Sequence, residues 1–155
     1  MKNELQPLLV LLAHNERLRD TALACHVRCA AACTAAAAQA EQLRTYRSEY
    51  EQRWRAQFAQ IGQSEVLQCY QSFMERLTHA LEHQARVVEH AGKQVEHALV
   101  ELRAGELRCA AVRMLIERRT LEQSHSIERH EQKLSDEFAA RAAWTRRTSG
   151  QPRLL

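Results

Sequence analysis

The sequence predicts an all-α protein, folded as a long antiparallel two-helix coiled coil (a helical hairpin) with a C-terminal helix overhang. Both prolines, Pro7 and Pro152, lie near the chain ends, and the chain holds only four glycines. Alanine, leucine, glutamate, glutamine and arginine dominate between the prolines, and all five favour helix. Apolar residues recur in steps of three and four along two long segments, which is the pattern of a coiled-coil seam.

The first helix is predicted at about residues 4–61. Its seam carries mostly apolar residues, and Asn15 and Gln39 are the polar exceptions. A seam of this length predicts a partner helix along most of the segment. The predicted seam positions are 11, 15, 18, 22, 25, 29, 32, 36, 39, 43, 46 and 50.

A loop is predicted at about residues 62–64. Gly62 can adopt the left-handed conformation that ends a helix. Ser64 can accept hydrogen bonds from the first free amides of the next helix as its N-cap. Because this loop is short, the two helices are expected to be antiparallel neighbours.

The second helix is predicted at about residues 65–147, and no charged residue enters its seam. The hairpin at 1–147 is expected to be a single domain, followed by a disordered tail at 148–155. The predicted seam positions are 67, 70, 74, 77, 81, 84, 88, 91, 95, 98, 102, 105, 109, 112 and 116.

The helices are unequal in length, so residues 122–147 should extend beyond the first helix as an overhang. A sparse apolar stripe continues there and needs a partner from outside the hairpin. From Ala139 to Leu155 the chain has four arginines and no acid. This end is either a solvated tail or a basic segment that seeks an acidic partner surface. The stripe consists of Ile127, Leu134, Phe138 and Ala142.

Three cysteines recur every four residues, at Cys25, Cys29 and Cys33. Such a ladder could bind a soft metal ion, but no second cysteine cluster accompanies it, which favours small apolar seam residues. The histidines His83, His90 and His97 are seven apart, too far to share one ion. We therefore expect no metal and no cofactor.

The same features exclude several function classes. The net charge of +3 is too small to argue for nucleic-acid binding. A two-helix rod offers no enclosed pocket for a small-molecule substrate, and no catalytic constellation is found, so the protein is not expected to be an enzyme. No segment reaches the roughly 20 apolar residues that span a membrane. The chain is expected to stay in the cytoplasm.

One apolar series lies beside the second seam, at Phe73, Ala80 and Val87. It either widens the core or forms a second strip that is exposed for a partner.

Three segments carry a resemblance to the flagellar export family FliJ: Tyr46-Arg-Ser-Glu-Tyr50, Tyr70-Gln-Ser-Phe-Met-Glu-Arg-Leu77 and Asp136-Glu-Phe-Ala-Ala-Arg-Ala-Ala143. The order and spacing of these segments, and the chain length, are similar to those of the family. The resemblance implies a cytoplasmic part of the flagellar type III export apparatus, similar to the central stalk of rotary ATPases.

The resemblance also implies partners. Family members insert the terminal half of the hairpin into the hexameric export ATPase (FliI-like), contact the export gate protein (FlhA-like) and are linked to export chaperones. Membrane association would be peripheral, through the gate, at the inner face of the cell membrane. Gln84 stands where the family often has histidine. The implied partner surface consists of Gln39, Leu43, Tyr46, Tyr50, Phe73, Leu77, Ala80 and Gln84.

Two alternative functions stay open at this point. One is the related stalk protein of a virulence type III secretion system, which shares the same architecture. The other, from a different class, is a metal-storage helical protein built on the cysteine ladder.

Overall fold

The computed structural model describes residues 4–58 and 64–150. It contains two helices, α1 (Gln6–Phe58) and α2 (Ser64–Ser149), and no strand in the described residues. Pro7 stands in the first turn of α1, where its missing N–H and fixed φ are tolerated. Glu65 in the first turn of α2, and Arg146 and Arg147 in the last, suit the helix dipole.

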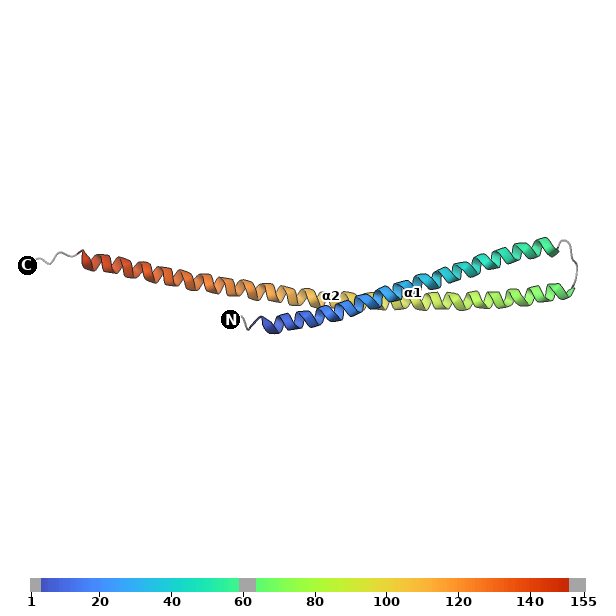
Figure 1. Ribbon diagram of the computed structural model, residues 1–155, viewed down its shortest axis with the longest axis horizontal. Helices are drawn as coiled ribbons and strands as arrows, with labels where there is room; N and C mark the ends of the chain where they lie inside the picture. Colours follow the sequence, from blue (N-terminus) through green and yellow to red (C-terminus); the bar gives the residue numbers. More distant parts are fainter. Residues whose placement is uncertain (1–3, 59–63, 151–155) are drawn as a thin grey trace, which may run out of the picture. The chain divides into compact units, whose positions relative to one another are not determined.

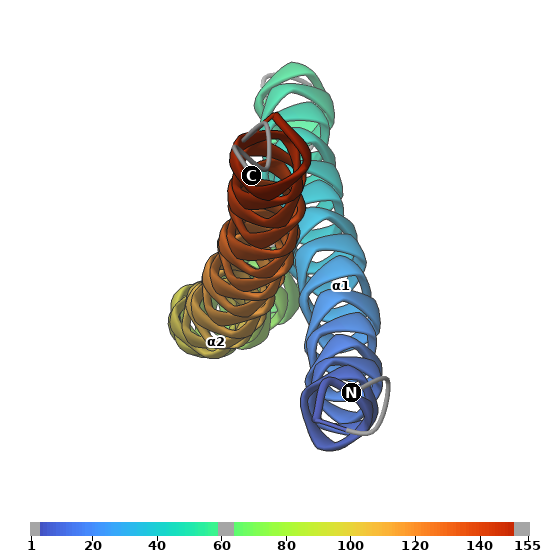
Figure 2. The same ribbon diagram turned by 90° about the vertical axis from the view of Figure 1, so that its left-hand side faces the viewer.

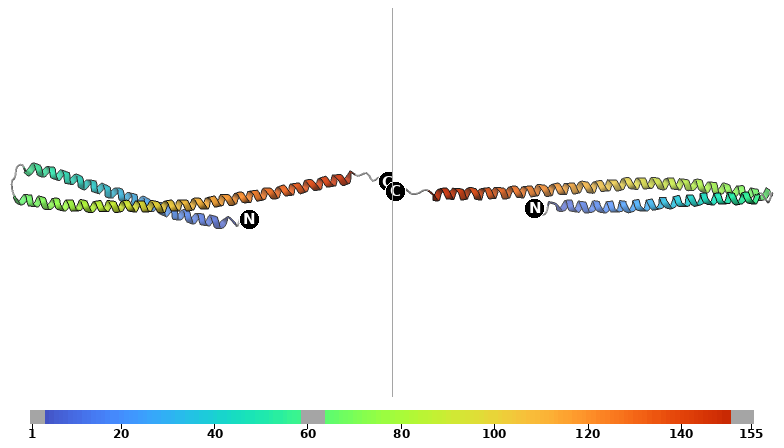
Figure 3. Two further views of the ribbon diagram at one scale, coloured as in Figure 1. Left: turned by 180° about the vertical axis from the view of Figure 1, so that it is seen from behind. Right: turned by 90° about the horizontal axis from the view of Figure 1, so that it is seen from above.

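Two compact units divide the chain. One consists of residues 15–108 and forms the hairpin proper; the other joins residues 1–14 to residues 109–155. Within residues 15–108, α1 and α2 lie side by side along their length (Figures 1, 2 and 3). Contacts pair rising numbers on α1 with falling numbers on α2: Arg19 with Gly105, Ala36 with Gln84 and Trp54 with Tyr70. The helices are therefore antiparallel, and the predicted all-α hairpin is confirmed.

The seam of α2 follows the sequence pattern closely. Every predicted position from Tyr70 to Ile116 is buried or half-buried, and only Leu67, the first, is exposed. The buried residues of this seam include Leu77, Ala98, Leu102 and Cys109. On this helix an apolar seam without charged residues was therefore enough to predict the buried face.

On α1 the predicted seam positions agree only partly with the structure. The predicted positions 15, 22, 25, 29, 36, 43 and 50 are buried or half-buried, but 11, 18, 32, 39 and 46 are exposed. The second row of the seam is displaced by one residue and runs through 19, 26, 33, 40, 47 and 54. Arg19 and Arg47 stand in this row and are half-buried, because the aliphatic stem of an arginine can cover apolar surface while its head reaches water.

The helix ends differ slightly from the predicted ones. α1 begins at Gln6, α2 begins at Ser64 itself, and α2 ends at Ser149 rather than at 147. Near that end, hydroxyls donate to main-chain carbonyls one turn earlier: Thr148 to Trp144 at 3.1 Å and Ser149 to Thr145 at 2.8 Å. These bonds lie in the last turn of the helix. The predicted end of the first helix at 61, Gly62 and residues 151–155 lie outside the described residues.

By length and composition, α1 is apolar enough to cross a membrane, since it contains an 18-residue window with a mean hydropathy of 1.3. The expectation that no segment reaches this level is therefore corrected. Alanine and cysteine residues raise the hydropathy of this helix. In the hairpin some of these small residues, including the buried Ala36 and Ala40, lie on the α2-facing side. Small seam residues let two helix backbones approach closely, so the same composition also suits a helix pair.

Candidate functional site

The predicted partner surface divides into three exposure classes. Gln39, Tyr46 and Ala80 are exposed, whereas Leu77 is 7% exposed and belongs to the core. The remaining members are half-buried: Leu43, Tyr50, Phe73 and Gln84. A partner can therefore touch only part of this set without opening the hairpin.

Aromatic rings fill the hairpin next to the connection between the helices. On α1, residues 46, 50, 54 and 58 recur every four positions and so share one face. The ring of Phe73 lies 4.4 Å from that of Tyr50 and 6.3 Å from that of Tyr46, measured between centroids. Farther along, Tyr70 contacts Trp54 at 5.1 Å and Phe58 at 5.4 Å. We call these six residues the aromatic ladder: Tyr46, Tyr50, Trp54, Phe58, Tyr70 and Phe73.

The ladder decides between the two interpretations of Phe73. Its ring packs edge-on against Tyr46 and tilted against Tyr50, the arrangements that aromatic pairs prefer. Phe73 therefore widens the core of the hairpin. Ala80 and Val87, by contrast, are exposed. The proposed strip is therefore not uniform, and its largest member belongs to the hairpin.

We expect Phe73→Ala to lower the thermal midpoint of the hairpin. The loss of stability should stay below the ~3–5 kcal/mol typical of a fully buried phenylalanine, because this ring is only half-buried. Val87→Ala, on the exposed side of the same helix, is the control and should change the midpoint little. Thermal unfolding followed by circular dichroism measures both, and equal midpoints for the two variants would show that Phe73 is not a core residue.

Gln84 explains how a polar residue fits into the α2 seam. Its side-chain amide donates a hydrogen bond of 2.9 Å to the main-chain carbonyl of Ala36 and lies 3.3 Å from Oε1 of Gln39. A polar side chain in an apolar seam favours one register over its neighbours, because any slip leaves the Gln84 amide without its partner. Gln84 thus favours the register in which it faces Ala36.

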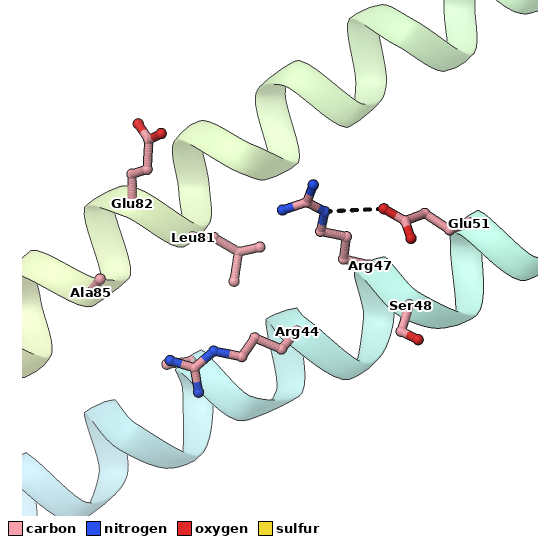
Figure 4. A pocket seen from close by; sticks show the side chains of 8 residues that line it. Arg44, Arg47, Ser48, Glu51, Leu81, Glu82 and Ala85 are labelled. Atoms are coloured by element: carbon pink, nitrogen blue, oxygen red, sulfur yellow. Dashed lines mark hydrogen bonds and ion pairs between the residues drawn. The ribbon is translucent and has the colours of Figure 1, made fainter.

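A hollow of about 520 Å³ lies between the helices beside Leu81 (Figure 4). Charged side chains line it, and Arg47 is paired with Glu51 at 3.4 Å. Arg44 is likewise paired, with Glu41 at 3.1 Å. Ion pairs three or four residues apart on one helix contribute little to stability. Both arginines of this hollow are thus paired with glutamates of α1.

The cysteine ladder borders an apolar groove of about 620 Å³ on the hairpin. Cys25 and Cys29 line it from α1, and His90 and His97 line it from α2. Burial raises the pKa of the Cys29 thiol, and the neighbouring Cys25 raises it further. Among residues 4–58 and 64–150, no three Cys, His, Asp or Glu side chains gather as a metal site would require.

We expect the triple variant Cys25→Ala, Cys29→Ala and Cys33→Ala to keep the helicity and function of the wild type. All three cysteines are half-buried beside other small residues, and alanine fits the same space. Metal analysis of the purified protein and motility after complementation provide the test. Stoichiometric copper or zinc in the wild type, with motility lost in the triple variant, would support a metal function instead.

The overhang carries exposed apolar side chains on one face. Every residue from Ser124 to Ser149 at the end of α2 is exposed; Figure 1 draws this segment in orange to red. Ile127, Leu134 and Phe138 are 50%, 43% and 69% exposed, and Ala142 follows. Steps of seven and four residues keep them near one side of the helix.

Sequence reasoning missed Trp144, which is 70% exposed. The available signal was the distribution of aromatic residues. Six of the eight form the aromatic ladder, and the other two, Phe138 and Trp144, both stand near the end of α2. An exposed tryptophan outside any core is typical of a contact surface.

Comparison with known proteins adds one finding. The sequence model of a family described as "Flagellar FliJ protein" matches residues 3–148 of the 155. No curated protein and no solved structure matches the chain.

Proposed function

Because the chain belongs to the flagellar FliJ family, we propose that it is a stalk-like adaptor of the flagellar type III export apparatus. The family consists of helical, non-catalytic proteins that take part in flagellar protein export in the cytoplasm. In the proposed role the protein docks in the export ATPase ring, contacts the export gate and the export chaperones, and catalyses no reaction itself. It reaches the inner face of the cell membrane only through the gate.

One observation carries the ATPase part of this proposal. Every described residue after Gln123 is exposed, and this part of α2 carries the apolar side chains of Ile127, Leu134 and Phe138. Isolated helices are marginally stable in water, so a long helix with apolar side chains gains from an external partner. The inside of a protein ring can contact such a helix along its length.

The test combines the purified chain with the export ATPase. We expect the two proteins to co-elute, and the chain to raise both the hexamer fraction and the rate of ATP hydrolysis. A ligand that binds the hexamer better than the monomer shifts assembly in this direction. If the hydrolysis rate and the oligomeric state stay unchanged at saturating amounts of the chain, the docking role is wrong.

The gate contact is proposed for the exposed members of the partner surface. Gln39, Tyr46 and Ala80 are open to solvent, whereas Phe73, Leu77 and Gln84 hold the two helices in place. The exposed group would touch the gate, and the second group would hold the exposed group in position. A pull-down with the cytoplasmic part of the gate separates the roles: Tyr46→Ala and Ala80→Asp should weaken binding more than they lower the thermal midpoint, whereas Leu77→Ala should lower the midpoint. If Tyr46→Ala and Ala80→Asp both bind normally, the gate contact lies elsewhere.

The virulence stalk shares this architecture, and the flagellar family match favours the flagellar system. A motility assay of a deletion strain complemented with this chain decides between them.

A further inference from the structure

In the hairpin at residues 15–108, arginines of α1 lie where apolar residues would normally pack against α2. Arg19 and Arg47 are half-buried, whereas their neighbours Leu18 and Tyr46 are exposed, at 47% and 45%. An amphipathic helix usually covers its apolar side chains and leaves its charged ones open to water. The face that α1 turns toward α2 is therefore not its most apolar face.

Three parallel rows of residues, each stepping by seven along α1, describe this choice. A shared row is buried or half-buried throughout: Asn15, Ala22, Cys29, Ala36, Leu43 and Tyr50. On one side of it lies the observed row, which completes the seam in the structure: Arg19, His26, Cys33, Ala40, Arg47 and Trp54. On the other side lies the alternative row: Leu18, Cys25, Ala32, Gln39 and Tyr46. A coiled-coil seam needs two adjacent rows, so the shared row can form one with either neighbour.

The composition of α1 divides its preference between the two rows. Leu18 and Tyr46 favour the alternative row, because covering them would remove apolar surface from water. The arginines of the observed row would then be free of packing, and Arg47 already reaches Glu51 of its own helix at 3.4 Å (Figure 4). Between these ends both rows carry mostly small residues, so the middle of the helix has little preference.

Two contacts bear on how α1 could change rows. Trp54 belongs to the observed row, and its ring lies 5.1 Å from that of Tyr70, so the aromatic ladder favours the observed seam. The hydrogen bond from Gln84 goes to the main chain of Ala36, which stands in the shared row. A turn of α1 about the shared row keeps Ala36 facing α2, so the register of the two helices need not change.

We propose that α1 turns by about 50° around its own axis between two seams, the observed one and one that uses the alternative row. The angle is half of the 100° between successive residues of a helix. Packed helices with two competing arrangements switch between them instead of deforming gradually. The ladder makes the observed seam the major one.

The turn would regulate the proposed gate contact, and this part of the inference rests on that contact. Gln39 and Tyr46 belong to the alternative row and are exposed in the observed seam. In the alternative seam both side chains face α2 and are withdrawn from a partner. The gate therefore binds the observed seam only, and its binding shifts the equilibrium toward that seam.

The cysteines of the chain report which row faces α2. Cys25 belongs to the alternative row and Cys33 to the observed row, and both are half-buried. A turn to the alternative seam covers Cys25 and uncovers Cys33, so their rates of alkylation by iodoacetamide change in opposite directions. Cys69 is exposed and provides the reference rate. In a full-length Cys29→Ala background, trypsin cleavage after Arg28 places Cys25 and Cys33 on different peptides for mass spectrometry.

Two double variants shift the seam in opposite directions. Arg19→Glu with Arg47→Glu removes the long stems that cover apolar surface, so we expect Cys33 to react several-fold faster, Cys25 to react more slowly and gate binding to fall several-fold. Arg19→Leu with Arg47→Leu favours the observed seam, so Cys33 should react more slowly, Cys25 at least as fast, and gate binding should be retained. Arg17→Glu with Arg44→Glu makes the same charge change at exposed arginines outside the three rows, and should alter neither rate.

The direction of the two rates decides the outcome. If Cys25 and Cys33 become faster together or slower together, the variants have changed overall stability; α1 then has one seam and the proposal is wrong, while the gate contact stands. The leucine variant alone suffices for this decision if the glutamate variant does not fold. If the rates move in opposite directions and gate binding does not follow, α1 has two seams but the turn does not regulate the gate contact.

Discussion

A chain that lacks residues 122–155 is expected to remain a folded hairpin and to lose its action on the export ATPase. Gln123 is the last half-buried residue of α2, and all described residues beyond it are exposed, so the deletion removes almost no core. It removes every apolar side chain of the overhang together with the C-terminal arginines. Circular dichroism should show a thermal midpoint close to that of the full chain, and the ATPase should no longer form additional hexamers.

The deletion changes chain length as well as surface, so a point variant is its companion. Phe138→Asp keeps the length and places a carboxylate where an apolar contact is expected, which would have to be desolvated on docking. We expect the same loss of hexamer formation. A truncated chain that still promotes hexamers would rule out the overhang as the docking element.

A second large effect, a loss of hairpin stability, is expected when Gly105 is replaced by a larger residue. A Cβ added there would lie 3.3 Å from Cα of Arg19 and 3.5 Å from its Cβ, so the obstacle is the backbone of α1 and cannot rotate away. Gly105 is buried at this close approach of the two helices. Gly105→Leu must push the helices apart and should destabilise the hairpin by ~1–3 kcal/mol or more.

Gly92 provides a matched control on the same helix, because a Cβ added there would meet nothing within 4 Å. Gly92→Ala should raise stability by roughly 0.5–1 kcal/mol, the usual gain when a helix-interior glycine is replaced. Urea unfolding of Gly105→Leu, Gly92→Ala and the wild type measures the three stabilities. If Gly105→Leu is as stable as the wild type, the close approach of the helices at Arg19 is incorrect.

The seams show what an apolar pattern can and cannot predict. On α2 no charge enters the seam, and its positions from Tyr70 onward follow from the sequence alone. On α1 one row of the seam passes through Arg19 and Arg47, which are half-buried. A search for apolar residues prefers the neighbouring row with Leu11 and Leu18, and those side chains are exposed. The apolar periodicity therefore predicts the helix pair. It does not predict which face of α1 turns toward α2, because that face includes two arginines.

The candidate site shows a similar division. Ile127, Leu134 and Phe138 could be found as a continued apolar stripe, and their exposure follows from the unequal helices. The role of Gln84 could not be predicted, since its hydrogen bond to Ala36 joins residues 48 positions apart. The burial of the Phe73 side chain could not be predicted either, because it depends on the tyrosines that face it from α1. Trp144 escaped because it stands off the stripe on another side of the helix.

The central claim is that the exposed end of α2 docks in the export ATPase, and a titration of the hydrolysis rate tests it most directly. Three full-length proteins are compared: the wild type, Phe138→Asp and Leu107→Asp, the last placing the same carboxylate at a 71% exposed residue of the hairpin. We expect saturable stimulation by the wild type and by Leu107→Asp, and none by Phe138→Asp over the same concentrations. Equal stimulation by Phe138→Asp and the wild type would contradict it.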